Sequence, residues 1–395
     1  MQFIVFAFGI LLFIGLVLVH EWGHFIMARR NGVDVEEFGL GFPPRAWSRK
    51  LKSGMRLSLN ILPLGGFVKL KGENDSDERK GSLGAASLMT KSKIMLAGVT
   101  MNLLAGLFML TILAWIGMPK LLTQDNVGQD QFTVARDTKV IQQRVLVGAI
   151  QPGSPASKAG LKPTDELLSA SYNGQTKDVK TPLQIHNATT AFAGQKISLT
   201  YKRNGQILQK PVQLLSKKTV QASQNTDDPK GYLGIVPTAL QIQRSTWSAP
   251  VVAVGLTGQI VKLTFVGLGH ALGGLGSTIA GGVTRNHQAR ENGQDQASSQ
   301  VGGPVAIGVA LWDYGNLGFN FMLFLIALIS LTLALMNVLP VPALDGGRLA
   351  MMLVSRGIFR RPLTRAAEER IVGASFALLL ALVALITVVD VKRFF

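Results

Sequence analysis

The sequence predicts an α-helical polytopic membrane protein with four transmembrane helices, a β-hairpin and an extracytoplasmic β-rich domain. Hydrophobic residues make up 47% of the 395 residues and charged residues only 16%, whereas a soluble domain is about a quarter charged. Four segments are long and apolar enough to cross about 30 Å of hydrocarbon. A long region with strand and turn signals lies between the second and the third.

The four apolar segments are expected to cross the membrane in alternating directions. They run over Phe3–Ala28, Ile94–Met118, Leu317–Leu339 and Ile371–Val389. The stretches that follow the first and third segments are rich in lysine and arginine, which predicts that both are cytoplasmic. Both ends of the chain and the central region then face outward. The first segment lacks a basic leader and is too long for a signal peptide, so we interpret it as a retained span.

A fifth apolar segment, Ala249–Val283, is rich in glycine and carries Lys262 and His270. A crossing here would reverse the third span and break the charge bias. The sequence therefore favours an interfacial or re-entrant helix. The stretch Arg285–Ser299 is polar and lacks core periodicity, which predicts a loop.

The central region is expected to form a compact β-rich domain. Strands are predicted at Val145–Ile150, Lys196–Arg203 and Ile207–Leu215, with a turn and a short helix ending near Gly160. Asn173-Gly174 is a hairpin-turn signal. The segment Gly231–Gly234 follows these strands, and we interpret it as a simple turn in preference to a carboxylate-binding loop.

A cluster of ionisable residues lies inside the first apolar segment. His20, Glu21 and His24 form a His-Glu-x-x-His pattern. Charged groups in hydrocarbon are costly, so an intramembrane cluster indicates a functional site. Residues four apart share one face of a helix, and this pattern binds Zn²⁺ with a general base beside it. The chain has no cysteine, so a zinc site must use histidine and carboxylate ligands.

A catalytic zinc site needs a third protein ligand and an open position for water. The best candidate is Asp345, which follows Pro340 and Pro342 at the cytoplasmic end of the third span. The first and third spans run parallel in the expected topology, so His20, His24 and Asp345 should share a depth. The alternative is that Asp345 only caps the end of the span.

The segment Arg56–Leu70 alternates between apolar and polar residues around a Pro/Gly break, close after the first span. An exposed strand edge here could pair with an extended substrate. The alternative is an ordinary cytoplasmic hairpin, since edge strands are common without such a role.

These residues resemble the site-2 protease family of intramembrane zinc metalloproteases, in the bacterial branch that performs regulated intramembrane proteolysis. The likeness rests on HEWGH, on NVLPVPALDGG and on the four-span layout with an external domain. Two departures are visible: Arg348 stands where a histidine is often found, and the match to the family's PDZ domain is weak from Thr176 to Ala193.

The resemblance implies roles for individual residues. It assigns His20, His24 and Asp345 as zinc ligands and Glu21 as the catalytic base. It assigns substrate binding to Asn337, Gly65, Gly66 and Phe67, the last three in a membrane-associated β-hairpin.

Topology and resemblance together imply a domain organisation. The expected parts are transmembrane helix 1 at 1–30, a cytoplasmic loop with the β-hairpin at 31–92, transmembrane helix 2 at 93–118, an extracytoplasmic PDZ-like domain at 119–240, an interfacial helix and polar loop at 241–316, transmembrane helix 3 at 317–347, a cytoplasmic loop at 348–370, and transmembrane helix 4 with its tail at 371–395.

The implied function is a zinc-dependent intramembrane endopeptidase of the cell membrane, with its active site near the cytoplasmic side. Its partners would be the lipid bilayer and transmembrane segments of single-pass proteins, such as trimmed anti-sigma factors or remnant signal peptides. The net charge of +17 clusters beside the spans, so membrane topology explains it better than nucleic acid. The alternatives are a non-catalytic membrane binding protein with a PDZ module and, more weakly, a transporter using the midplane charges.

Overall fold

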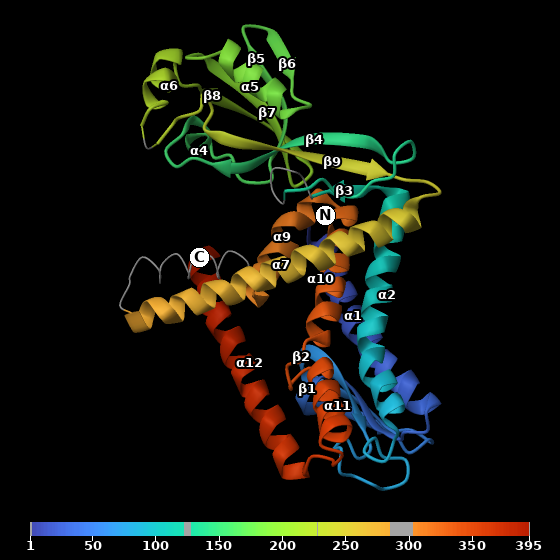
Figure 1. Cartoon of the computed structure of the whole chain (residues 1–395). Helices are drawn as coiled ribbons and strands as arrows, with labels where there is room; N and C mark the ends of the chain where they lie inside the picture. Colours follow the sequence, from blue (N-terminus) through green and yellow to red (C-terminus); the bar gives the residue numbers. More distant parts are fainter. Residues whose placement is uncertain (1, 122–127, 227, 285–302, 395) are drawn as a thin grey trace. The chain divides into compact units, whose positions relative to one another are not determined.

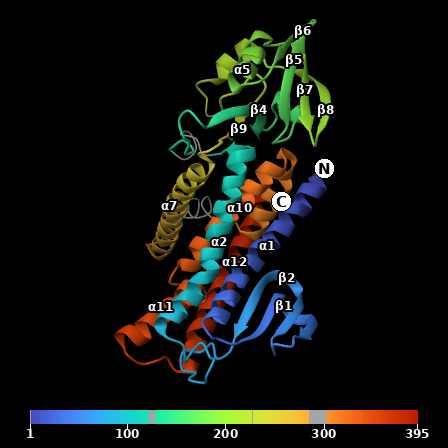
Figure 2. The ribbon, with the colours of Figure 1, turned by 90° about the vertical axis from the view of Figure 1, so that its right-hand side faces the viewer.

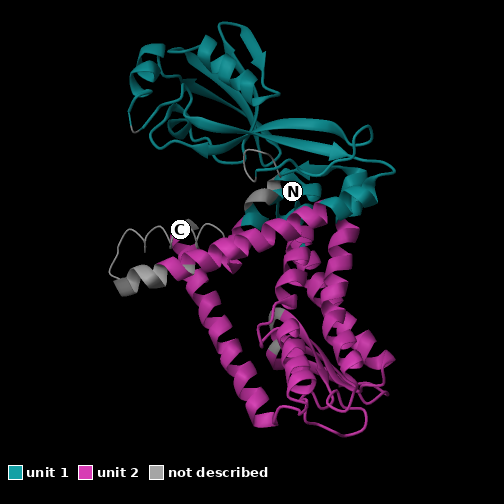
Figure 3. Ribbon diagram, viewed as in Figure 1, with its two compact units in different colours: residues 1–7, 110–255, 310–324 teal, residues 8–109, 256–309, 325–395 magenta. Residues whose placement is uncertain are grey.

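The computed structural model describes residues 2–121, 128–226, 228–284 and 303–394. The chain forms two compact units, one built from 1–7, 110–255 and 310–324, and the other from 8–109, 256–309 and 325–395 (Figure 3). Several helices run through both units. The predicted loop Arg285–Ser299 lies outside the described residues.

The first unit is rich in β structure. Its strands are β3 (Met118–Lys120), β4 (Lys139–Ile150), β5 (Glu166–Tyr172), β6 (Gln175–Asp178), β7 (Lys196–Arg203), β8 (Gln206–Gln213) and β9 (Ile235–Arg244). They form one sheet in the order β3-β9-β4-β5-β7-β8, with β6 paired to β5. Its short helices are α4 (Pro155–Lys158), α5 (Pro182–Ala191) and α6 (Lys217–Ser223). Buried residues such as Leu199 and Tyr201 form its core.

Local sequence explains much of this unit. Asn173 and Gly174 have positive φ angles and connect β5 to β6, as the hairpin signal predicts. Thr181 begins α5 with a capping box that includes Gln184. Gly231–Gly234 lies between regular elements, in agreement with the interpretation as a turn, but it does not follow the last strand of the domain. The segment leads directly into β9, which pairs with β4 inside the sheet.

The second unit contains most of the long apolar helices. Besides α4, α5 and α6, the helices of the described residues are α1 (Gln2–Arg30), α2 (Leu88–Ile116), α7 (Ala249–Thr284), α9 (Pro304–Tyr314), α10 (Phe319–Val338), α11 (Asp345–Leu353) and α12 (Arg365–Phe394), with a 3₁₀ turn at Gly315–Leu317 and the π-helical turn η2 at Val354–Ile358. Five of them are long and apolar enough to cross a membrane: α1, α2, α7, α10 and α12. The chain is therefore a multi-pass membrane protein.

The count of five span-competent helices differs from the four spans expected from sequence, because α7 also meets the criterion over Ala249–Gly274. Within the second unit, the part of α7 beyond residue 255 runs crosswise to α12 (Figure 1). Length and composition alone do not distinguish a spanning helix from an interfacial one.

Two long antiparallel strands, β1 (Val35–Lys50) and β2 (Arg56–Leu70), complete the second unit beside α1 (Figure 2). Residues 35–40 pair with 66–70 on one side and with 56–59 on the other, and residues 45–50 pair with 56–60. Residues 66–70 thus form an edge of this small sheet. We refer to them below as the edge strand.

Candidate metal centre

Helix α1 carries three of the predicted site residues in its C-terminal half. His20 and His24 lie one turn apart, and their rings meet edge to face with centroids 4.8 Å apart. His24 is buried, whereas His20 and Glu21 are half-buried. The helical repeat alone places both imidazoles on one face.

Asp345 reaches the same place from a different part of the chain. Helix α10 ends at Val338, and α11 begins at Asp345 after a turn containing two prolines. The two glycines that follow Asp345 let this turn close tightly. A Cβ atom on Gly346 would lie 2.1 Å from the Val338 carbonyl oxygen, and one on Gly347 would lie 1.9 Å from the Val341 oxygen. The Asp-Gly-Gly sequence is therefore required by packing as well as by the position of the carboxylate.

The three predicted ligands converge on one point. The Nε2 atoms of His20 and His24 lie 3.2 Å apart, and each lies 3.2 Å from Asp345 Oδ2. Ligand atoms around a tetrahedral zinc ion with bonds of about 2.0–2.1 Å are separated by about 3.3 Å. The donor set and its spacing therefore fit zinc. Among the described residues, this is the one cluster of metal-binding side chains found.

The imidazole orientations support the same conclusion. His24 Nδ1 lies 2.8 Å from the Ile94 carbonyl oxygen of α2, which can only accept. Nδ1 therefore carries the proton, and the unprotonated Nε2 points toward Asp345. Metal-binding histidines usually donate their other N–H group in this way, because the contact fixes the tautomer.

Helix α2 contributes two residues that the sequence analysis missed. A Cβ atom on Gly98 would lie 2.4 Å from His24 Nε2 and 2.7 Å from His20 Nε2, so the bare glycine backbone makes room for both rings. Asn102, one turn further, is buried, and its amide Nδ2 lies 3.3 Å from His20 Nδ1. The available signal was a small residue and an amide four positions apart in an apolar helix.

The Asn102 amide has a buried Oδ1 atom for which no partner is found among the described residues. The oxygen and the nitrogen of a side-chain amide have almost the same size and geometry. Which atom is which is therefore assigned from the hydrogen bonds that each could make. Exchanging the two atoms would let Oδ1 accept a hydrogen bond from a protonated His20 Nδ1, which leaves His20 Nε2 unprotonated and able to bind a metal. Asn102 then orients His20 as the Ile94 carbonyl orients His24.

Glu21 lies against the edge strand. Its carboxylate lies near the backbone N–H group of Val68. A Cβ atom on Gly66 would lie 3.2 Å from Glu21 Cγ, so Gly66 approaches the glutamate closely. Phe67 packs on Gly39 of the neighbouring strand, where a Cβ atom would lie 2.4 Å from its ring. Of the three predicted substrate-binding residues of β2, Gly66 thus lies beside Glu21 and Phe67 packs on the neighbouring strand.

The remaining predicted residues are less tightly linked to the centre. Gly65 has a positive φ angle at the bend before the edge strand. Asn337 lies in the last turn of α10 and is half-buried. His186 on α5 and His270 on α7 are exposed, and neither joins the metal cluster. His287 and Glu291 lie outside the described residues.

Two imidazoles and a carboxylate around one point, with a glutamate beside them, define a zinc metallohydrolase. Comparison with known proteins makes the class specific. The sequence model of peptidase family M50 matches residues 8–382, and the chain belongs to this family.

Three similar relatives each carry the name "Putative zinc metalloprotease". The protein of Clostridium perfringens is 29% identical over 384 residues, covering 97% of both chains. That of Nostoc sp. is 30% identical and covers 93% of this chain and 90% of its own. That of Vibrio cholerae is 26% identical and covers 93% and 94%. The chain is therefore a zinc metalloprotease with several membrane-spanning helices.

Proposed function

We propose that this protein is an intramembrane endopeptidase that hydrolyses peptide bonds in the transmembrane segments of single-pass proteins. The observation that carries the proposal is the position of the metal centre. His20 and His24 lie inside a helix that is apolar enough to cross a membrane, and Asp345 lies within 3.2 Å of both. A site at this depth is suited to substrates that are themselves in the bilayer.

The chain's residues divide the chemistry between them. His20, His24 and Asp345 hold zinc, which, when bound, makes a water molecule more acidic and polarises the scissile carbonyl. Glu21, beside the histidine pair, accepts the proton of the attacking water and delivers it to the leaving amide nitrogen. The close approach of Gly66 limits where the Glu21 side chain can lie.

The edge strand supplies a means of presenting the substrate. A transmembrane helix shields its amides with its own hydrogen bonds, so the substrate must unwind before attack. Residues 66–70 pair with β1 on one side and contact Glu21 through Gly66 and Val68. An extended substrate that adds to this edge would lie beside the catalytic base. We propose substrate contacts for Gly65, Gly66 and Phe67, and for Asn337.

The charge pattern supports a cytoplasmic location for the metal centre. Arg29 and Arg30 end α1 five and six residues after His24, and basic residues at span ends favour the cytoplasmic side. We propose that α7 lies in the membrane interface. The crosswise direction of its later part (Figure 1) favours this arrangement. The β-rich unit would then lie outside the cytoplasm.

A groove in the β-rich unit favours peptide binding there. It has a volume of about 380 Å³ and lies between α5 and the segment that leads into β9. Its lining includes His186, Lys230 and the Gly231–Gly234 segment. A helix, a strand and a glycine-containing turn in this arrangement suit an extended peptide end whose carboxylate meets backbone N–H groups. Such a PDZ-like role suits trimmed anti-sigma factors or remnant signal peptides. A domain that only kept proteins with large external domains away from the metal centre would need no such groove.

The proposed function is tested by reconstituting the full chain in vesicles with a single-span substrate. Zinc-loaded protein should cut within the apolar segment, and Glu21→Gln should keep zinc but stop the cutting. Cleavage by Glu21→Gln at the wild-type rate would refute the proposal. A non-catalytic binding protein would instead retain the substrate uncut in both forms.

A further inference from the structure

The carboxylate of Glu73 joins the end of β2 to the helix that carries Asp345. Glu73 Oε1 accepts the backbone N–H of Leu70, the last residue of β2, at 2.9 Å. Glu73 Oε2 accepts from Arg348 Nη2 at 3.1 Å. Arg348 lies on α11, three residues after Asp345. One side chain therefore spans the short distance between the edge strand and the metal-binding helix.

A second group of contacts holds the loop that follows β2, which contains Glu73 and Asp75. Arg356 in η2 donates from Nε to both carboxylate oxygens of Asp75 at 2.9 Å, and from Nη2 to the carbonyl oxygens of Asp75 and Gly84 at 2.6 and 3.1 Å. Lys91 also binds Asp75, and Lys91 and Asp75 are both buried. This cluster anchors the loop as a whole. Moving the loop would separate buried charged groups, and a buried charge left without its partner is strongly destabilising.

Apolar packing brings the same elements together. Leu70, Val35 and Met352 belong to one buried cluster, and Leu349 packs against it. The strand end and α11 therefore share a core. Apolar contacts are not directional, so they leave the register between strand and helix to the polar contacts. The Glu73 carboxylate is the polar group that connects the last strand residue to α11.

We propose that Glu73 and Arg348 form a positioning pair that fixes the edge strand relative to Asp345, so that an extended substrate pairs in productive register. This inference rests on the proposed function of the edge strand. It gives a role to Arg348, which is one of the two departures of this sequence from the family pattern. Neither residue touches the metal ligands through a described contact, so both are positioning residues.

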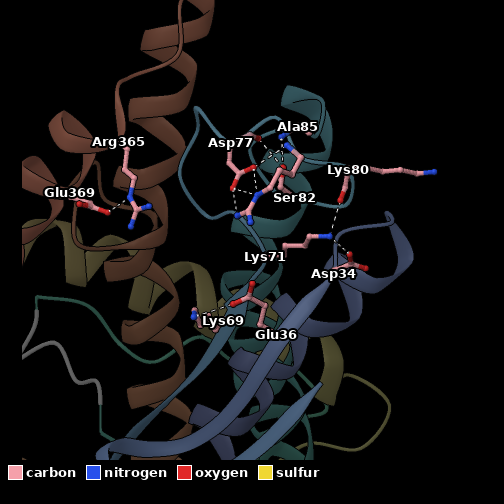
Figure 4. Close-up of polar contacts among 11 residues, drawn as sticks. Asp34, Glu36, Lys69, Lys71, Asp77, Lys80, Ser82, Ala85, Arg365 and Glu369 are labelled. Carbon is pink, nitrogen blue, oxygen red and sulfur yellow. Dashed lines mark hydrogen bonds and ion pairs between the residues drawn. The ribbon is translucent and has the colours of Figure 1, made fainter. Parts of the chain in front are cut away.

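Other ion pairs on the same sheet provide matched controls (Figure 4). Lys69 on the edge strand pairs with Glu36 at 3.1 Å, and Lys71 pairs with Asp34 at 3.0 Å. The first pair links β2 to β1. The second links the residue just after β2 to the residue just before β1, and no described contact extends from either pair to α11. Glu36→Ala thus removes a carboxylate from the same sheet while leaving the link between strand and helix intact.

The expected effect is a loss of preorganisation. A loosened strand occupies its binding-competent position for a smaller fraction of the time, and apparent substrate affinity falls by that fraction. Once the substrate is bound in register, the catalytic step is unchanged. Glu73→Ala should therefore raise KM by about tenfold, from the strength of hydrogen bonds to charged groups, and leave kcat within about twofold.

Hydrogen–deuterium exchange tests the inference without using activity. In the zinc-loaded full chain, amides of residues 66–70 should exchange at least about tenfold faster in Glu73→Ala and about threefold faster in Arg348→Ala. The double variant should match Glu73→Ala, because the two residues act as one unit. Glu36→Ala should exchange like wild type. Equal zinc content in all variants shows that the fold is retained. Glu73→Gln can accept only one of the two hydrogen bonds, so its exchange rate should lie between those of wild type and Glu73→Ala.

Two results would overturn the inference: unchanged exchange in Glu73→Ala and Arg348→Ala, or a kcat loss with unchanged KM on a fluorophore-labelled single-span peptide in vesicles. The proposed function can fail separately. If exchange rises as expected but wild type cuts no single-span peptide, the positioning pair stands and the protease assignment to such substrates fails.

Discussion

Gly98→Ala is the substitution that most sharply tests the packing of α2 against the histidine pair. The added Cβ atom would lie 2.4 Å from His24 Nε2, 2.6 Å from His20 Cε1 and 2.7 Å from His20 Nε2. Ordinary van der Waals contact begins near 3.4 Å, so the imidazoles or the helix must move by about 1 Å. His24 cannot move freely, because Nδ1 is bonded to the Ile94 carbonyl at 2.8 Å.

A shift of that size is large for a metal site. Metal–ligand distances tolerate only about 0.2 Å, and a 1 Å misplacement of reacting groups costs about a hundredfold in rate. We therefore expect zinc affinity to fall by about ten- to a hundredfold and kcat/KM by about a hundredfold or more. Competition with a fluorescent chelator measures the affinity, and the single-span peptide assay measures the rate.

Gly15→Ala on α1 is the matched control, because nothing lies within 4 Å of the Cβ position there. It should keep wild-type zinc affinity and activity and should not lower the melting temperature, since alanine is the better helix former. If Gly98→Ala bound zinc within about twofold of this control, the inferred close contact between α2 and the histidines would be refuted.

Three further outcomes follow from the same geometry. Asn102→Ala should weaken zinc binding by about ten- to a hundredfold, and Asn102→Asp should weaken it less; equal affinity in Asn102→Ala and wild type would exclude the orienting role. Glu21→Gln should bind zinc normally and lose about 10²–10⁴ in kcat, whereas a loss of zinc would instead make Glu21 structural. Hydrogen bonds from Ser248 and Thr246 hold the pKa of Asp137 well below its usual range. The charged carboxylate therefore stabilises the fold above about pH 4, and this stabilisation is lost as the pH falls toward the lowered pKa. Asp137→Asn should therefore melt at a lower temperature at neutral pH and show a shallower decline in acid; parallel curves would contradict this.

The metal centre was accessible from sequence because its residues are chemically conspicuous. Two histidines and a glutamate in an apolar helix need a reason, and charge patterning alone placed Asp345 at the same depth. The structure brings Asp345 Oδ2 to 3.2 Å from both imidazoles. The prediction needed no knowledge of packing, because the pattern of costly groups carried the information.

Gly98, Asn102 and the Glu73–Arg348 pair were not accessible in the same way. Gly98 acts by lacking a side chain, and glycine is common in membrane helices for several reasons. Glu73 and Arg348 are 275 residues apart, so their pairing depends on how α11 packs beside β2. Periodicity within one segment carries no information on such contacts.

The central claim is hydrolysis within a transmembrane segment, with water as the nucleophile and Glu21 as its base. The most direct measurement is mass spectrometry of the products formed from a reconstituted single-span substrate in oxygen-18 water. We expect a new C-terminus inside the apolar segment that carries one oxygen-18 atom, formed by the zinc-loaded wild type and not by Glu21→Gln. A cut confined to the flanking polar residues, or equal labelled product from Glu21→Gln, would contradict the account.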